Sequence, residues 1–181
     1  MSARAALRAA TMDDHERVDR LFSRFDLSAT ESYGRFLTAQ AAAHLPIEAA
    51  LEAAGAGQLV ADWEQRKRSH LLQADLAELG IGIPAPVEPP PLPGAQAVLG
   101  ALYVLEGSRL GGAVLKRGLP AAAPERFLGA EQAPGAWRKL LAKLEESLYE
   151  PALVEAASQT AREVFRRFED AGRRYVGTAQ A

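Results

Sequence analysis

The chain has 181 residues, with 21 Lys and Arg against 23 Asp and Glu and a formal net charge of −2 at neutral pH. A chain of this length can bury about 70% of its unfolded surface in one core, so we expect a single domain over residues 1–181. A slightly acidic chain has no overall basic field for a phosphate backbone, and nucleic acid is not an expected partner. The absence of cysteine excludes disulfides, cysteine zinc sites and thiolate-bound iron.

The first half of the chain is expected to be helical, because alanine and leucine are frequent and alternating β-branched runs are rare. A first helix is expected from about Arg4 to Arg24. Ser28–Glu31 has the spacing of a capping box that starts a second helix, which Pro46 is expected to interrupt. A short helix over 47–54 and a long one over 58–79, each followed by glycine, complete this half.

The second half begins with a proline-rich segment at about 81–94, which contains six prolines and is expected to be an extended surface loop. A glycine-containing helix follows it. A break over 118–124 and a short helical turn over 125–128 come next. Trp137 then opens another helix, and Pro151 precedes the last one. The expected fold class is all-α, with several helices in one domain.

The segment over residues 100–112 reads GALYVLEGSRLGG and places glycines inside an amphipathic helix. Gly107, Gly111 and Gly112 together forgo about 3 kcal/mol of helix stability relative to alanine. Without Cβ atoms, the helix can bend and a flat, bulky ligand can lie almost against its backbone. Close packing of a neighbouring helix is the other use of the same small residues.

A histidine borders the apolar stripe of the first expected helix. His15 lies one turn before Val18, in a stripe that continues through Leu21, Phe22 and Phe25. A lone histidine beside a core is usually a hydrogen-bonded packing residue. Together with a glycine-rich face on a later helix, however, it gives the two sides of a haem pocket, with imidazole on one face of the iron and room for a small molecule on the other.

These residues resemble the biliverdin-producing haem (heme) oxygenase family, and its bacterial branch in particular. The shared landmarks keep the family's order along nearly the whole chain: Leu7–Thr11 before His15, Asp62-Trp63 and Arg66 before Leu72–Gly80, and the specific string over Gly100–Gly112. The resemblance implies a multi-helical haem oxygenase fold. It also implies opening of the haem ring by dioxygen to biliverdin, carbon monoxide and ferrous iron, with haem as both substrate and cofactor.

The resemblance also implies roles for particular residues. His15 is the expected iron ligand, and the expected residues on the opposite, distal face are Gly107, Ser108, Gly111 and Gly112. Many animal members have an aspartate at the position of Ser108, whereas the bacterial branch commonly has serine there. The absence of this carboxylate leaves the proton relay unassigned. Arg109 is expected to point to solvent.

Several cationic or phenolic groups are candidates for binding the two haem propionates. Arg8 is the best defined, because it precedes His15 by seven residues and shares nearly the same helix face. The further candidates are Tyr103, Lys116, Arg166 and Arg173. Arginines on a terminal helix can equally be solvated groups that complement the helix dipole.

The sequence has no flavin or nicotinamide fingerprint, so electrons are expected from an external reductase or ferredoxin. The product could serve iron acquisition, haem turnover or chromophore synthesis, the last with a bilin acceptor such as a phytochrome. Neither an amino-terminal apolar leader nor an apolar run of membrane-spanning length is evident, so we expect a soluble cytoplasmic protein without a membrane partner.

Three other interpretations stay open. A non-catalytic haem sensor or carrier would keep the pocket without turnover, and a plain helical interaction protein would not bind haem. A non-haem di-iron oxidase of the same fold would need inward carboxylates and Glu-x-x-His patterns. The remaining histidines, His44 and His70, are expected to be polar boundary residues, with His70 on a strongly cationic surface.

Overall fold

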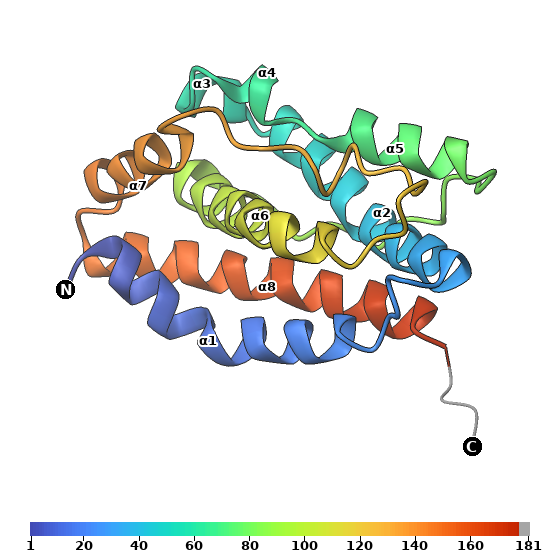
Figure 1. Ribbon diagram of the computed structural model, residues 1–181. Coiled ribbons are helices and arrows are strands. Elements are labelled where there is room, and N and C mark those ends of the chain that lie inside the picture. The colour runs from blue at the N-terminus through green and yellow to red at the C-terminus, as the bar shows by residue number, and fades with distance from the viewer. Residues whose placement is uncertain (178–181) are drawn as a thin grey trace.

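The computed structural model describes residues 1–177, and within that range it contains helices and no strand. The eight helices are α1 (Ala3–Phe22), α2 (Thr30–Ala53), α3 (Ala56–Leu59), α4 (Trp63–Arg66), α5 (Ser69–Glu78), α6 (Gly94–Lys116), α7 (Ala136–Ser147) and α8 (Pro151–Tyr175). The long helix α8 packs against α1, α2 and α6 (Figure 1). The all-α prediction is confirmed.

The beginning of α1 is fixed by a second helix. Ser2 accepts a hydrogen bond from the backbone N–H of Ala5 at 3.2 Å, as an N-cap residue does. The carboxylate of Glu145 on α7 accepts the backbone N–H groups of Ala3 and Arg4 at 2.9 and 3.0 Å. Its negative charge also suits the positive end of the helix dipole. From this point α1 runs along α8 at one side of the molecule (Figure 1).

Helix α6 runs through the middle of the bundle, in contact with α2, α7 and α8. It is the one helix within residues 1–177 that is long and apolar enough to cross a membrane, and 56% of its apolar window is buried inside the protein. A helix surrounded by other helices needs this composition, so the expectation that no such run exists is wrong for α6. Gly100 gives α6 its close approach to α8, because a Cβ there would lie 2.2 Å from the carbonyl oxygen of Ala157.

The second helix differs from the prediction at both of the positions singled out in the sequence. Helix α2 continues through Pro46 without interruption. Its N-cap residue is Ala29, and no side chain makes a capping hydrogen bond there. The Ser28 hydroxyl instead donates to the carboxylate of Asp26 at 2.6 Å, which closes a local turn before the helix.

The long helix expected over 58–79 is three short ones, α3, α4 and α5. Extended backbone at Val60, with ψ of 114°, ends α3, and extended backbone at Lys67, with ψ of 135°, ends α4. The alanine- and leucine-rich pattern cannot reveal these breaks, because contacts with the rest of the protein create them. The buried side chains of this segment, described below, supply those contacts.

The proline-rich segment is non-helical over residues 81–93, as predicted. It lies against α2, because the N–H of Val87 donates to the carbonyl of Ala42 at 2.7 Å. Residues 125–129 form a hydrogen-bonded turn and no helix, with the N–H of Gly129 bonded to the carbonyl of Glu125 at 2.7 Å. We refer to residues 125–129 as the 125–129 turn.

The 125–129 turn is anchored by Asp75 of α5, which is completely buried. The carboxylate of Asp75 accepts the backbone N–H of Phe127 at 2.9 Å and that of Arg126 at 3.2 Å. The turn then meets the carboxyl-terminal half of α6, where a Cβ at Gly112 would stand 2.9 Å from the carbonyl oxygen of Leu128. Gly112 is therefore required for the close approach of this turn to α6.

Candidate functional site

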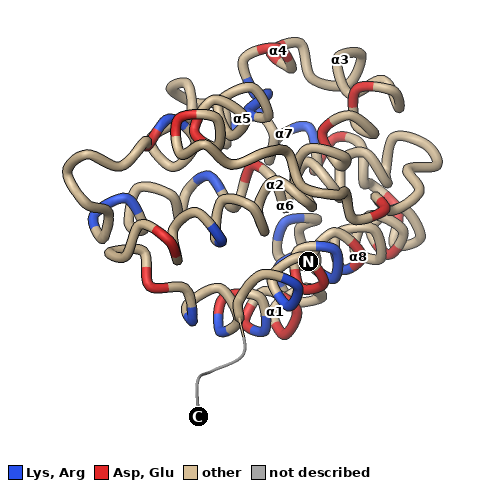
Figure 2. The backbone as a smooth tube through the Cα atoms, turned by 90° about the vertical axis from the view of Figure 1, so that its right-hand side faces the viewer, with Lys and Arg blue, Asp and Glu red and all other residues tan. Residues whose placement is uncertain are grey.

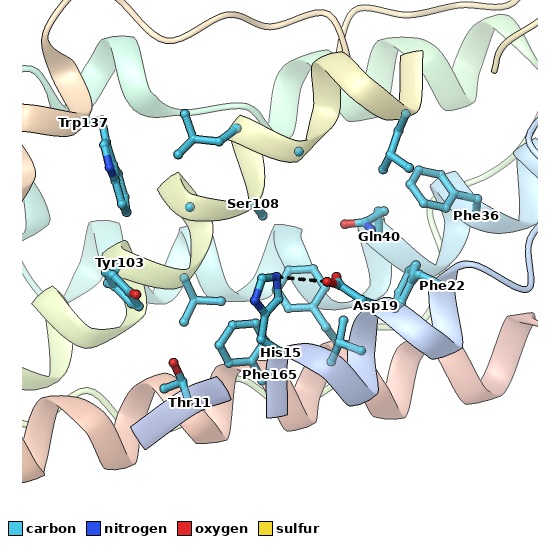
Figure 3. Close-up of a pocket in the computed structure, with 17 residues that line it drawn as sticks. Thr11, His15, Asp19, Phe22, Phe36, Gln40, Tyr103, Ser108, Trp137 and Phe165 are labelled. Atoms are coloured by element: carbon cyan, nitrogen blue, oxygen red, sulfur yellow. Dashed lines mark ion pairs between the residues drawn. The ribbon is translucent and has the colours of Figure 1, made fainter. Parts of the chain in front are cut away.

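A cavity of about 540 Å³ lies between α1, α6 and α8, with further walls from α2 and α7. Figure 3 shows His15 on α1 across the cavity from Ser108 on α6, with Tyr103 and Trp137 toward one end and Gln40 toward the other. Because these helices are far apart in the sequence, the cavity exists only in the folded chain. Its walls are mainly apolar and aromatic, as expected for a site that binds an organic ligand.

The imidazole of His15 is accessible from the cavity. Its side chain is 61% exposed, its Nε2 atom lies 3.3 Å from Oδ2 of Asp19, and its ring centroid lies 5.5 Å from that of Phe165 on α8 (Figure 3). The aromatic ring supports one side of the imidazole, and the carboxylate can accept its N–H. His15 is therefore not sequestered in the core, and a ring nitrogen can serve as a ligand.

The α6 side of the cavity is formed by part of the glycine-rich segment. Gly107, Ser108 and Gly111 line the cavity. A Cβ at Gly111 would meet nothing within 4 Å, and one at Gly107 would meet only the edge of Trp137 at 3.7 Å. Gly112 is turned away and packs on the 125–129 turn. Three of the four expected distal residues thus face His15 across the cavity, and the fourth does not.

Of the expected propionate groups, Tyr103 lines one end of the cavity and Arg8 lies near it. The rings of Tyr103 and Trp137 lie with centroids 5.8 Å apart. Burial raises the pKa of the Tyr103 phenol, and the nearby positive charges of Arg4 and Arg8 partly oppose this effect. Arg8 is exposed and outside the cavity lining, but it lies close enough to Tyr103 to act on it electrostatically.

The three further expected propionate groups, Lys116, Arg166 and Arg173, also lie outside the cavity lining. Each is paired with a carboxylate: Lys116 with Glu125, Arg166 with Glu163 and Arg173 with Glu169. Basic and acidic residues are interspersed along α1 and α8 (Figure 2). The i,i+3 and i,i+4 spacing of such charges on α8 favours pairing along the helix surface.

A buried cluster of charged residues lies behind α6. Arg66, Arg68 and Glu106 are only 2–4% exposed, and Nη1 of Arg66 donates to Oε2 of Glu106 at 3.0 Å. Arg109 is also buried, so the expectation that it points to solvent is wrong. It follows Leu105 by four residues on the buried face of α6, and this spacing is the signal that the sequence analysis missed.

The two remaining histidines have different environments. His44 is buried, not at the boundary as expected, and burial lowers its pKa even though its Nε2 lies 3.0 Å from Oε2 of Glu48. Burial alone would raise the pKa of Glu48, but hydrogen bonds from His44, from the backbone N–H of Arg68 and from Ser69 lower it to about 2. His70 is exposed, but the arginines before it are buried, so it does not lie on the expected cationic surface.

Groups of three or more His, Cys, Asp or Glu side chains that could hold a metal ion are absent from residues 1–177. The di-iron alternative requires several such side chains around one centre. The described part of the chain therefore offers no donor set for it. The single imidazole beside a large apolar cavity is the donor arrangement of a haem site.

Comparison with known proteins identifies the family. No family model matches the chain. A curated protein of Xanthomonas campestris named heme oxygenase is 38% identical over 112 residues, which cover 59% of this chain and 67% of that protein. The chain belongs to the haem oxygenase family.

Solved structures of haem oxygenases share the fold. The NO- and CO-bound heme oxygenase from Neisseria meningitidis has a TM-score of 0.83 and 25% identity, covering 100% of this chain and 96% of that one. Heme oxygenase from Leptospira interrogans has a TM-score of 0.73 and 18% identity, covering 95% and 98%. The prediction of a haem oxygenase fold is therefore confirmed.

The cavity of this haem oxygenase fits haem, the substrate and prosthetic group of the family. His15 provides an accessible nitrogen donor of the kind that holds haem iron. At Gly111 the α6 backbone is open to the cavity, so a flat ring can approach it without meeting a side chain. Aromatic rings such as Trp137 and Phe165 provide apolar surface for the porphyrin.

Proposed function

We propose that this haem oxygenase binds haem in the cavity between α1, α6 and α8 and opens its ring there to biliverdin, carbon monoxide and ferrous iron. The observation that carries the proposal is the accessible imidazole of His15, directly across one cavity from Gly107, Ser108 and Gly111. Bound haem supplies the iron that activates dioxygen and the ring that is oxidised. Helices α1 and α8 are far apart in the sequence but pack against each other, so we also propose that residues 1–181 form one domain.

His15 is the proposed iron ligand. A neutral imidazole has one lone pair for the metal and one N–H, which Asp19 is placed to accept. A carboxylate in this position fixes the tautomer and orientation of the ring and increases the basicity of the ligating nitrogen. The ring of Phe165 limits how far the imidazole can tilt.

The glycine-rich face of α6 is the proposed distal wall. Gly107 and Gly111 leave space between the haem face and the α6 backbone for a small molecule, and the narrow space restricts where that molecule can lean. Ser108 supplies a hydroxyl on this wall that can donate or accept hydrogen bonds. Gly112 contributes indirectly, because it lets the 125–129 turn support α6 from behind.

Arg8 and Tyr103 are the proposed propionate contacts. A guanidinium can bind a carboxylate through two parallel hydrogen bonds, and a phenol can donate a third. Arg8 has no ion-pair partner within residues 1–177, so binding a propionate breaks no existing ion pair. Lys116, Arg166 and Arg173 would have to exchange their present carboxylate partners, which favours Arg8 over them.

The electron donor is proposed to be a separate reductase or ferredoxin, which the lack of a flavin or nicotinamide fingerprint supports. We place the reaction in the cytoplasm, where such donors occur. A bilin acceptor such as a phytochrome is one proposed consumer of the product, beside iron acquisition and haem turnover.

The test is turnover of the purified haem complex. With dioxygen and a reductase, ferredoxin or ascorbate as electron source, the Soret band should disappear and a bilin should be recovered by chromatography. The isomer recovered identifies the carbon at which the ring opens. A Soret band that persists under these conditions would favour the non-catalytic haem sensor or carrier.

A further inference from the structure

The guanidinium of Arg68 lies directly behind the part of α6 that faces the cavity. The residue is 3% exposed, and its Nη2 atom donates to the carbonyl oxygen of Leu105 at 2.8 Å and to Oγ of Ser108 at 3.2 Å. Because Nη2 carries two hydrogens, both contacts can be made at once. Arg68 therefore joins a backbone carbonyl and a hydroxyl of the same turn of α6.

Several contacts hold Arg68 in this position. Its backbone N–H donates to Oε2 of Glu48 at 2.7 Å, and its Cζ atom lies 4.8 Å from the ring centroid of Phe127. Burial and the charge of Arg109 lower the pKa of Arg68 to about 10, while Glu106 and Glu48 oppose this decrease. The guanidinium is thus a fixed positive charge at neutral pH.

The contacts of Arg68 change what the Ser108 hydroxyl can do. At present Oγ of Ser108 donates its proton to the carbonyl oxygen of Leu105 at 2.7 Å. If the hydroxyl turns toward the cavity, that carbonyl keeps the hydrogen bond from Arg68 and is not left unsatisfied. A cation that donates to Oγ also polarises the hydroxyl and makes it a stronger donor.

We propose that Arg68 is a positioning residue that keeps the Ser108 hydroxyl available as a hydrogen-bond donor to a ligand on the α6 side of the haem. This role rests on the proposed function, because haem must occupy the cavity. It gives the reaction a polarised donor at residue 108 without a carboxylate there. Arg68 itself stays behind the helix and touches neither haem nor the ligand.

The test uses the ferric haem complex and azide as an anionic probe, titrated by visible absorption. Ser108→Ala should weaken azide binding about tenfold, because one hydrogen bond to a charged group is lost. Arg68→Met should weaken it about fivefold, and Arg68→Lys about threefold, because an ammonium keeps the charge but not the forked contact. The control Arg117→Met, an exposed arginine at the end of α6, should change it less than about twofold.

The double variants decide whether Arg68 acts through Ser108. In the Ser108→Ala background, Arg68→Met should change azide affinity less than about twofold. An equal loss in both backgrounds, or no loss for either Arg68 variant alone, would overturn the proposal. If Arg68→Met does not fold, the same comparison with Arg68→Lys decides.

The result of the azide test can be distinguished from a failure of the proposed function. Failure of the parent protein to give a saturable Soret shift with haem would overturn both proposals. A normal Soret shift with no effect of Arg68 on azide affinity would overturn only the role of Arg68.

Discussion

The Nε2 atom of His15 lies 3.3 Å from Oδ2 of Asp19, one turn further along α1. The two side chains are both largely exposed, at 61% and 67%, so their pairing is not enforced by burial. An N–H at Nε2 can donate to this carboxylate while Nδ1 keeps a lone pair for a metal. Asp19 can thus serve as a hydrogen-bond acceptor for a metal-bound imidazole.

Asp19→Asn should weaken haem binding about tenfold, because a neutral amide replaces the negatively charged acceptor that orients the imidazole and increases its basicity. Haem titration followed at the Soret band measures the change. The matched control is Asp13→Asn, an exposed carboxylate outside the cavity lining, which should leave the affinity unchanged. Equal affinities for the two variants would contradict the assignment of Asp19.

His15→Ala should abolish the spectrum of histidine-bound haem, because residues 1–177 place no other histidine in the cavity lining. Visible absorption and a haem titration give the measurement, and imidazole added to the solution should partly restore the spectrum. His70→Ala removes an exposed histidine outside the cavity and should have no effect. A His15→Ala protein with the parent spectrum would show that the iron ligand lies elsewhere.

Two adjacent glycines of α6 should respond in opposite directions to alanine. Gly111→Ala places a methyl group in open space, so the free energy of unfolding of the haem-free protein should rise by about 1 kcal/mol while haem binds less tightly. Gly112→Ala drives a methyl group against the Leu128 carbonyl, and the free energy of unfolding should fall by about 1–3 kcal/mol. Urea denaturation compares the two, and equal effects would contradict the assignment of Gly111 to the cavity.

The buried pair of His44 and Glu48 should make the haem-free protein sensitive to acid. The pKa of His44 is lowered in the folded state, so the unfolded state binds more protons and the free energy of unfolding falls as the pH drops below 6.5. The pKa of Glu48 is lowered from 4.5 to about 2, so its contribution is present above pH 4.5 and is lost between pH 4.5 and 2.

Urea denaturation across this pH range measures both effects. His44→Gln should remove the part of the loss that begins below pH 6.5, and Glu48→Gln the part below pH 4.5. Stability curves for the two variants that parallel the parent curve would show that neither group titrates differently on folding.

The sequence was sufficient for the features that depend on local patterns. Helical periodicity predicted α1, α7 and α8, and proline density predicted the loop at 81–93. His15 and the glycine-rich string also led to the two facing walls of the cavity, because each carries a chemical signal at its own position. Which of those residues perform the reaction stays a prediction.

Features that depend on long-range contacts were not predictable. Pro46 within α2 and the breaks that divide 56–78 into three helices reflect packing, which overrides local preference. Gly112 has the same local signal as Gly111, but only the distant 125–129 turn distinguishes their roles. The arginines Arg66 and Arg68 look like surface residues until Glu106 and the carbonyl of Leu105 are found beside them.

Gly100 lets the backbones of α6 and α8 almost touch, and the cavity opens further along the same two helices, between Gly111 and Phe168. The space between α6 and α8 is thus a wedge with its narrow end at Gly100, which lies outside the cavity lining. A side chain at Gly100 would push α6 and α8 apart, so the width of the cavity depends on a position three turns from Gly111.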